Sequence, residues 1–566
     1  MDSNNTSEKT GLSTKELAIY IGVPVATLCV AGGLYYYYTK KTSTSETQTK
    51  SVKGTDGAPV AVVTPQITSG EETGTPLEIA QSSKSKGNKY FKAGRFEQAI
   101  ECYTKALEFC PKDNVGEIAT FYQNRAAAYE QLKKWQNVAD DTSKAIELNP
   151  KYTKALLRRA RAHEALDLKR DCLEDVTAVC LLEGFQNQPS MILADRILKA
   201  IGKELGAEYF KTRPHVLPSP VFVKSYLDSF NKDVFSVDFP ENEQTSECTY
   251  FKILTHMKNK EYENIVDLCT QEIDNDGKYK IYALLLRGTM YTLMCYVGKA
   301  MDDFDGVIQA EDTKGYEKLK IDALIKRGSL KMQEAKDAEC YADFDEAIKI
   351  DANNANIYHH RGQLYFLTER LSEGQKEFEK AMSLDPNFVA PRIQLGYCLC
   401  KIAMQMMSPS MLKEANAVLE ETIKHFPNCA EAWSLYGQLL QDQQDLNSAS
   451  EKLEKAISLA PYNPTTYVYK ALLTLQWKQD IEEATKLIRK AIELDDKCDF
   501  AYETLATLEV QKGNNEEAVR LFERAIDLVR TEAEMASTFS LLEAAKAQSK
   551  VTKLYGITLP SMPGMM

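Results

Sequence analysis

Five polar residues recur along the first third of the chain at a spacing that can bring them together. They are Lys84 and Asn88, then Asn124, then Lys154 and Arg158, so successive groups lie about one 34-residue period apart. The two lysines and the arginine supply positive charge, and the two carboxamides supply neutral donors. Charge-assisted hydrogen bonds from such a set suit paired carboxylates. The residue types therefore predict non-covalent binding of acidic groups rather than covalent catalysis.

The elements that would position these residues are repeated. The first repeat runs from Ala80 to Pro111, and we number its positions as places, with Ala80 as place 1. Small residues stand at places 8 and 20, and large residues stand at places 11 and 24. The fixed points of the pattern are Gly87, Tyr90, Ala99, Tyr103, Ala106 and Pro111. This is the pattern of a tetratricopeptide repeat, two antiparallel helices in about 34 residues. The small residues let the helices touch, and the large ones fill the remaining gap. One such unit cannot bury its own apolar face, so the pattern predicts a stack.

The pattern divides the chain into two blocks. Residues 80–186 hold three repeats, the helical connection 187–245 contains several prolines, and 246–532 holds about eight repeats as a second block. Residues 533–566 are expected to be a capping helix and tail that close the stack. The repeat from Val389 to Cys429 is about seven residues too long, and we expect the excess to lengthen the turn between its helices. The predicted fold is an all-α tetratricopeptide-repeat solenoid.

The register of the repeats places the five polar residues on one side. Places 2, 5, 6 and 9 of a first helix share a face, because they differ by three or four residues. Lys84 and Asn88 occupy places 5 and 9, Asn124 occupies place 6, and Lys154 and Arg158 occupy places 2 and 6. The small and large core places alone set this register. The alternative is that lysine and arginine on a helical repeat are merely solvated.

The same concave places in the second block carry no charged set. Most are apolar or neutral, and we take six as candidate groove residues: Leu285, Ile325, Ile393, Tyr397, Val468 and Leu472. A groove lined in this way suits an amphipathic or hydrophobic segment with anchors at helical spacing. The alternative is that these side chains pack between neighbouring turns of the superhelix.

The amino terminus carries the one long uncharged run of the chain. Residues 17–38 contain no charge, and at about 1.5 Å per residue they can cross a hydrocarbon core of about 30 Å as one helix. The charge-mixed tail 1–16 and the lysines after the run favour an uncleaved signal anchor over a cleaved signal peptide. More lysines follow the run than precede it, which predicts a cytosolic carboxy-terminal part. Residues 39–79, rich in Ser, Thr, Gly and Pro, are expected to be a disordered tether.

Composition excludes several classes of function. The net charge of -12 argues against a nucleic-acid partner. The thirteen cysteines form no CxxC pair and the six histidines form no HxxxH or HExxH spacing, so we expect neither a metal nor a disulfide. No GxGxxG, GxxxxGK[ST] or GxSxG string is present, and we expect no cofactor and no catalytic residue. An enzyme with a tetratricopeptide arm would need a catalytic domain, and the helical pattern from 80 to about 555 leaves no room for one.

Two resemblances extend this interpretation. The strings KSKGNKYFKAG, NRAAAY and KALLRRARAH resemble the dicarboxylate clamp of co-chaperone domains, which holds the carboxy-terminal Glu-Glu-Val-Asp end of heat-shock seventy and ninety class chaperones. The anchor, tether, clamp block, connection and longer block together resemble the family of seventy-kilodalton import receptors of the mitochondrial outer membrane translocase.

This resemblance implies a single-pass outer-membrane receptor with its amino terminus in the intermembrane space. It would dock chaperones through Lys84, Asn88, Asn124, Lys154 and Arg158. It would then receive hydrophobic precursors with internal targeting signals, and pass them to the outer-membrane channel beside other translocase subunits. A membrane-anchored co-chaperone of another organelle, such as the endoplasmic reticulum, is the alternative.

Overall fold

A computed structural model describes residues 74–231, 234–237, 239–240, 247–310, 315–334 and 336–556. The predicted tail 1–16, the predicted span 17–38 and residues 39–73 of the predicted tether lie outside this part. Across the described ranges all regular secondary structure is helical, from α3 to α27, which confirms the all-α prediction. None of the helices described is long and apolar enough to cross a membrane.

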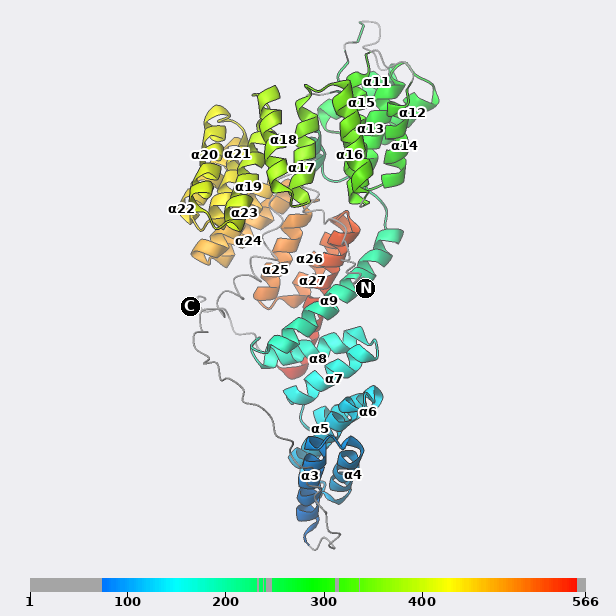
Figure 1. The fold of residues 1–566 in the computed structure, drawn as a ribbon, viewed down its shortest axis with the longest axis vertical. Helices are drawn as coiled ribbons and strands as arrows, with labels where there is room; N and C mark the ends of the chain where they lie inside the picture. Colours follow the sequence, from blue (N-terminus) through cyan, green and yellow to red (C-terminus); the bar gives the residue numbers. More distant parts are fainter. Residues whose placement is uncertain are drawn as a thin grey trace, which may run out of the picture. The chain divides into compact units, whose positions relative to one another are not determined.

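The described chain forms two compact units. One, the small unit, comprises residues 74–202 and 540–556; the other, the large unit, comprises residues 203–539. Consecutive helices pack as antiparallel pairs (Figure 1). The small unit contains three such pairs within its described residues: α3 (Pro76–Lys92) with α4 (Phe96–Phe109), α5 (Val115–Gln131) with α6 (Trp135–Leu148), and α7 (Thr153–Ala165) with α8 (Lys169–Leu182).

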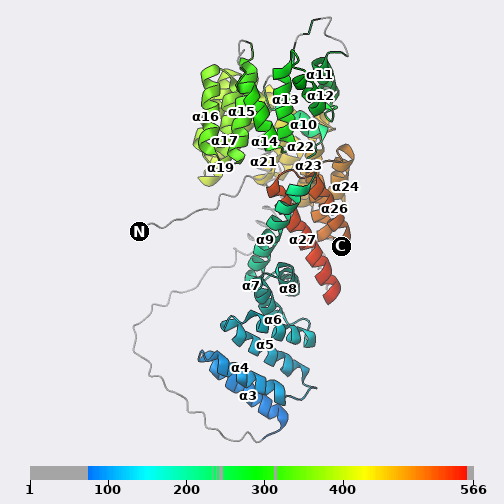
Figure 2. The ribbon, with the colours of Figure 1, turned by 90° about the vertical axis from the view of Figure 1, so that its right-hand side faces the viewer.

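The large unit is also built from paired helices (Figure 2), and its described part contains eight pairs. Helices α9 (Gln188–Thr212), of which residues 203–212 belong to this unit, and α10 (Pro220–Asp228) precede them. The paired helices are α11 (Thr249–Asn259) and α12 (Ile265–Asp274), α13 (Lys280–Leu293) and α14 (Val297–Ile308), α15 (Glu317–Gln333) and α16 (Asp337–Ile350), α17 (Ala355–Leu367) and α18 (Leu371–Leu384), α19 (Val389–Gln405) and α20 (Pro409–His425), α21 (Ala430–Asp442) and α22 (Leu446–Leu459), α23 (Pro464–Lys478) and α24 (Ile481–Leu494), and α25 (Asp499–Gln511) and α26 (Asn515–Leu528).

Several pairs are held by the contact that the repeat pattern predicts. In α17, a Cβ atom added to Gly362 would lie 2.8 Å from Cε1 of Phe378 in α18, closer than carbon atoms can approach. The same clash would arise between Gly87 and Tyr103, at 2.7 Å, in the first pair. Phe378 and Tyr103 are both buried. The glycine therefore lets two helices pack against a large side chain at one fixed register.

A second recurring interaction joins the helices of a pair. The arginine at place 7 of the first helix forms a two-point ion pair with a carboxylate 16 residues later, as in Arg125–Asp141 and Arg159–Asp175. Arg287–Asp303, Arg327–Asp343 and Arg361–Glu377 repeat it in the large unit. We did not predict this pair from the sequence, although its constant spacing is readable there. Because the carboxylates are largely buried, each depends on its arginine.

The expectation that the extra residues of the long repeat lengthen its turn is wrong. Helices α19 and α20 have 17 residues each, whereas α17 and α18 have 13 and 14, so the seven extra residues lengthen the helices. The connection between α19 and α20 covers only 406–408, which is as short as the connection 368–370 of the preceding pair. The extra residues continue the helical hydrogen bonds, because no proline or glycine interrupts Cys398–Gln405.

The carboxy-terminal helix α27 (Glu532–Tyr555) does not cap only the second block. Its residues 532–539 belong to the large unit, where Thr538 donates a hydrogen bond to Glu503 at 2.7 Å. Its residues 540–555 belong to the small unit, where Val551 packs in one cluster with Leu156 and Val179. The apolar face left open by the third repeat is therefore covered by the end of the chain.

Substituting Gly362 by alanine tests the packing contact. The added methyl must push Phe378 aside, and we expect a loss of about 1–3 kcal/mol, seen as a lower melting temperature. Gly298 of α14 is the matched control, since an added Cβ there meets no atom within 4 Å. Its substitution by alanine is expected to leave stability unchanged or raise it by less than about 1 kcal/mol. Equal melting temperatures for the two variants would refute the contact's role.

Candidate functional site: a carboxylate-binding surface on the small unit

Lys84 lies on α3 and faces α5. Helix α3 starts with a capping box, in which the Thr75 side chain accepts from the Glu78 amide and Glu78 accepts from the Thr75 amide. Two turns later the Lys84 ammonium pairs with Glu117 of α5 at 2.8 Å and lies 5.5 Å from the Phe121 ring centroid. The Lys84 and Glu117 side chains are 23% and 33% exposed, so solvent and ligands can reach this ion pair.

Asn88, one turn further along α3, is oriented by a tyrosine. The Tyr103 hydroxyl donates to the Asn88 side-chain oxygen at 2.8 Å. Burial raises the pKa of Tyr103 to about 12, so the hydroxyl keeps its proton and its role as donor at neutral pH. With its oxygen engaged, the carboxamide has its NH₂ group left to donate to a ligand.

Arg158 reaches α5 from the other side, on α7. Its Nε donates to Glu130 at 2.6 Å, and its Nη1 lies 3.4 Å from the backbone oxygen of Gln123. Glu130 is only 14% exposed and also meets Arg161 at 3.4 Å. These contacts fix the plane of the guanidinium while Nη2 has no partner within the described chain. A fixed guanidinium loses little entropy when it binds a carboxylate.

The two remaining residues have no protein partner in the described structure. Asn124 lies on α5 next to Gln123, the residue whose backbone oxygen contacts Arg158, and is half-buried. Lys154 is exposed one turn before Arg158 on α7. The structure thus brings Lys84 and Arg158 onto α5 from both sides, with Asn124 on α5 itself. We name these five candidate residues the carboxylate-binding surface, after the role expected from the sequence. The surface offers cations and amides but no nucleophile.

Two carboxylates that pair with residues of this surface were not predicted from the sequence. Glu117 lies in a turn of α5 that precedes the first place of the repeat, where the repeat pattern defines nothing. Glu130 lies 28 residues before Arg158, and only the packing of α5 against α7 reveals the pair. Arg159, the neighbour of Arg158 at place 7, has a different partner. Its Nε and Nη2 donate to the two carboxylate oxygens of Asp175, within its own helix pair.

The six apolar candidates of the second block do not line an open groove. Leu285 and Ile325 are 0% and 1% exposed and belong to one hydrophobic cluster of the large unit. The others belong to a second cluster, in which Ile393, Tyr397 and Val468 are buried and Leu472 packs against them. They therefore pack between repeats, which is the alternative that the sequence left open. Tyr397 of α19, for example, donates a hydrogen bond to the backbone oxygen of Leu435 in the next first helix, α21, at 3.1 Å.

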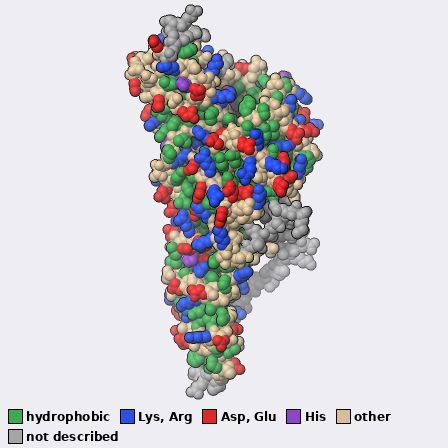
Figure 3. Space-filling view, turned by 180° about the vertical axis from the view of Figure 1, so that it is seen from behind, with side chains coloured by type: hydrophobic (Ala, Val, Ile, Leu, Met, Phe, Trp, Pro, Cys, Tyr) green, Lys and Arg blue, Asp and Glu red, His purple; other side chains and the backbone are tan. Residues whose placement is uncertain are grey.

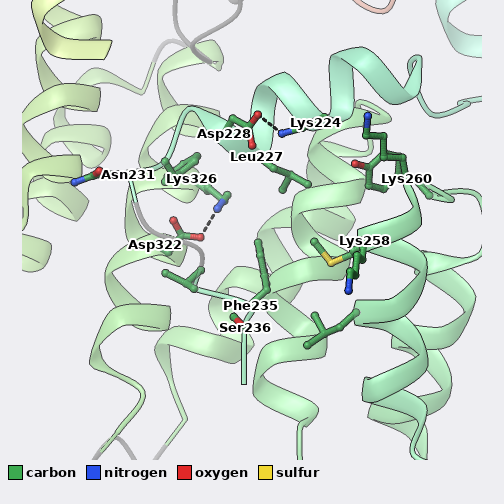
Figure 4. A pocket seen from close by; sticks show the side chains of 15 residues that line it. Lys224, Leu227, Asp228, Asn231, Phe235, Ser236, Lys258, Lys260, Asp322 and Lys326 are labelled. Atoms are coloured by element: carbon green, nitrogen blue, oxygen red, sulfur yellow. Dashed lines mark hydrogen bonds and ion pairs between the residues drawn. The ribbon is translucent and has the colours of Figure 1, made fainter. Parts of the chain in front are cut away.

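The large unit instead opens at a cavity of about 770 Å³ (Figure 4). Residues of α10, α11 and α15 line it, together with residues 230–231 and 234–236. Its apolar lining consists of Leu227, Phe230, Val234, Phe235, Leu254 and Met257. At its base, Lys326 is ion-paired with Asp322 and lies 3.9 Å from the Phe230 ring centroid. Burial lowers the pKa of Lys326, and the Asp322 carboxylate opposes that shift.

The described residues offer little support for thiol chemistry, metal binding or nucleic-acid binding. The twelve cysteines of this part are free, and burial raises the pKa of Cys172 and of Cys398 to about 12, which makes these thiols unreactive at neutral pH. No group of three histidine, cysteine or carboxylate side chains within the described ranges is arranged to hold a metal ion. On the face drawn in Figure 3, basic and acidic side chains are interspersed, without a basic stripe.

Comparisons with known proteins agree with this architecture. Models of the tetratricopeptide repeat match residues 80–113, 355–388 and 412–464. The mitochondrial import receptor subunit TOM70 of Homo sapiens is 44% identical over 98% of this chain and 94% of its own length. The Rattus norvegicus protein of the same name is 48% identical over 86% of this chain and 82% of its own length. The crystal structure of yeast Tom70 aligns with a TM-score of 0.52 at 25% identity, over 85% of this chain and 98% of that one.

These relatives decide between the alternatives left open by the sequence. Their identity extends over nearly the whole chain and is not confined to the repeats that many co-chaperones share. A co-chaperone of another organelle and an enzyme with a tetratricopeptide arm are thereby excluded. The chain belongs to the TOM70 family of mitochondrial import receptor subunits, and it is an import receptor of the mitochondrial outer membrane rather than an enzyme.

Proposed function

We propose that the carboxylate-binding surface docks cytosolic heat-shock seventy and ninety class chaperones by their acidic carboxy-terminal tails. The observation that carries this proposal is the pairing state of the five residues. Lys154 and Asn124 have no protein partner in the described structure, and Arg158 is oriented by Glu130 with Nη2 left over. A tail with several carboxylates would satisfy all three.

We further propose that the large unit receives the apolar targeting segment of a precursor at the cavity beside α10. The supporting observation is the combination of an apolar lining with lysines at the mouth, among them Lys258 and Lys260. A cavity of about 770 Å³ lies in the range of known ligand pockets. It would take the apolar face of one or two helical turns, and the receptor would then release the segment to the outer-membrane channel and its partner subunits.

The proposed topology rests on the sequence alone. Residues 17–38 would cross the outer membrane once, with 1–16 in the intermembrane space and the two units in the cytosol. Residues 39–73 would then connect the span to α3. This topology gives the carboxylate-binding surface access to cytosolic chaperones, as the docking proposal requires.

Replacing Arg158 by alanine tests chaperone docking. Loss of a desolvated charge contact costs about 2–5 kcal/mol, so affinity for a peptide ending in Glu-Glu-Val-Asp should fall about thirtyfold or more by calorimetry. The fold should survive with a lower melting temperature, because Glu130 loses its closer partner and keeps Arg161 at 3.4 Å. Arg159→Ala is the matched control: it strips the buried Asp175 of its two-point partner and should lower the melting temperature. Arg158→Ala binding within threefold of wild type would refute the proposal.

A photo-crosslinker tests the precursor site. Placed at Met257, which lines the cavity, it should label a multispanning carrier precursor. Placed at Ile393, which is 2% exposed, it should label far less. A soluble non-mitochondrial protein offered to both variants measures unspecific labelling. Equal labelling at the two positions, or equal labelling of the unrelated protein, would show that the cavity is not the receptor site.

Protease treatment of intact mitochondria tests the topology. Cleavage within residues 39–73 should release one large soluble fragment, because the helical repeats behind it are packed and resist cutting. An antibody against the carboxy-terminal helix would detect that fragment in the supernatant. If the fragment stays intact and protected until the outer membrane is ruptured, the orientation inferred from the lysines is wrong.

A further inference from the structure

One turn of α5 lies outside the repeat pattern. Helices α7, α17, α21 and α25 have 13 residues and begin at place 1 of their repeats, whereas α5 has 17 and begins four residues earlier, at Val115. Val115 is 42% exposed, and a Cβ atom added to Gly116 would meet nothing within 4 Å. The extra turn is therefore only lightly packed at its start.

This extra turn places a carboxylate on the carboxylate-binding surface. Glu117 takes the Lys84 ammonium at 2.8 Å, with both side chains partly exposed. A ligand carboxylate bound by Lys84 needs the same donor. An ammonium has three N–H groups, but Glu117 also brings a like charge to the spot where the ligand must bring its own. In the free protein, the Glu117 carboxylate thus occupies the position at Lys84 that a ligand carboxylate would take.

We propose that Glu117 is an internal competitor that the acidic tail must displace from Lys84, and that it thereby sets the selectivity of the surface. This inference rests on the docking function proposed above. A weakly acidic peptide cannot offer a carboxylate at Lys84, so it leaves the Lys84–Glu117 pair in place and meets the negative charge of Glu117. A tail with several carboxylates exchanges one ion pair for another and keeps its contacts at Lys154 and Arg158.

The second carboxylate of the surface has a different role. Glu130 is 14% exposed, binds Nε of Arg158 at 2.6 Å and also meets Arg161. Displacing it would leave a buried charge with one distant partner, which is costly. Glu117 has more than twice that exposure and one flexible partner, so it can swing into water. Only Glu117 is therefore placed to give way to a ligand.

The test is a double-mutant cycle in the full chain with a peptide ending in Glu-Glu-Val-Asp. Glu117→Gln removes the competing charge and should tighten binding about two- to fivefold, the range expected for a partly exposed ion pair. The gain should disappear in a Lys84→Ala background, because the two effects act through one contact. The slope of log Kd against log salt should be steeper for Glu117→Gln than for wild type, since binding then forms one additional net ion pair.

Glu97→Gln is the matched control. Glu97 lies in the first turn of α4 in the same unit, is exposed, and has no ion pair in the described structure, so the same substitution should leave affinity and salt slope unchanged. Melting temperatures separate any loss of helix stability from the binding effect. Unchanged or weaker binding by Glu117→Gln, or an equal gain in the Lys84→Ala background, would overturn the inference. If the wild-type protein does not bind the peptide, both the docking proposal and the competition proposal are wrong. If the wild-type protein binds, Arg158→Ala abolishes binding and Glu117→Gln leaves it unchanged, then only the competition proposal is wrong.

Discussion

The three helix pairs of the small unit depend on the close approach of a small residue at place 8 to a partner at place 24. The sizes of the two residues compensate for each other. In the first repeat Gly87 lies against Tyr103, whereas the second and third have alanine at place 8, Ala126 and Ala160, and smaller residues at place 24, Thr142 and Val176. All of the last four are 0% exposed. This size matching fixes how one helix is rotated against the next, and so decides which places face a ligand.

The carboxylate-binding surface follows from that constraint. Once helix rotation is fixed, place 6 of α7 puts Arg158 against α5, while place 7 turns Arg159 toward Asp175 of its own pair. Of these two adjacent arginines, Arg158 has the binding role that we propose, and Arg159 holds its own helix pair together. The same rule operates in the large unit, where the six apolar candidates at places 5 and 9 are buried or half-buried in its hydrophobic clusters. The cavity beside α10 lies outside the repeat pattern.

The sequence predicts the features that recur in every repeat, but it does not predict the features that the repeat pattern leaves undefined. The core places give the repeats and the rotation of their first helices, because each place needs a residue of a certain size in every copy. The core places do not define the extra turn at Glu117, which α3 and α15 also have at their starts. They also do not define the added helical turns of α19 and α20 or the wall formed by α10, so no size pattern in the repeat marks these features. The burial of Ile325 and Ile393 depends on neighbouring repeats, which the pattern of a single repeat does not describe.

A crystal structure of the protein with a peptide ending in Glu-Glu-Val-Asp would test the account most directly. We expect peptide carboxylate oxygens about 2.7–2.9 Å from Lys154 Nζ and from Nη2 of Arg158, with the Arg158–Glu130 pair retained and Glu117 turned away from Lys84. A peptide bound on any other surface, or one that leaves Lys154 and Arg158 without carboxylate partners, would contradict the central claim that these repeats build a receptor for acidic chaperone tails.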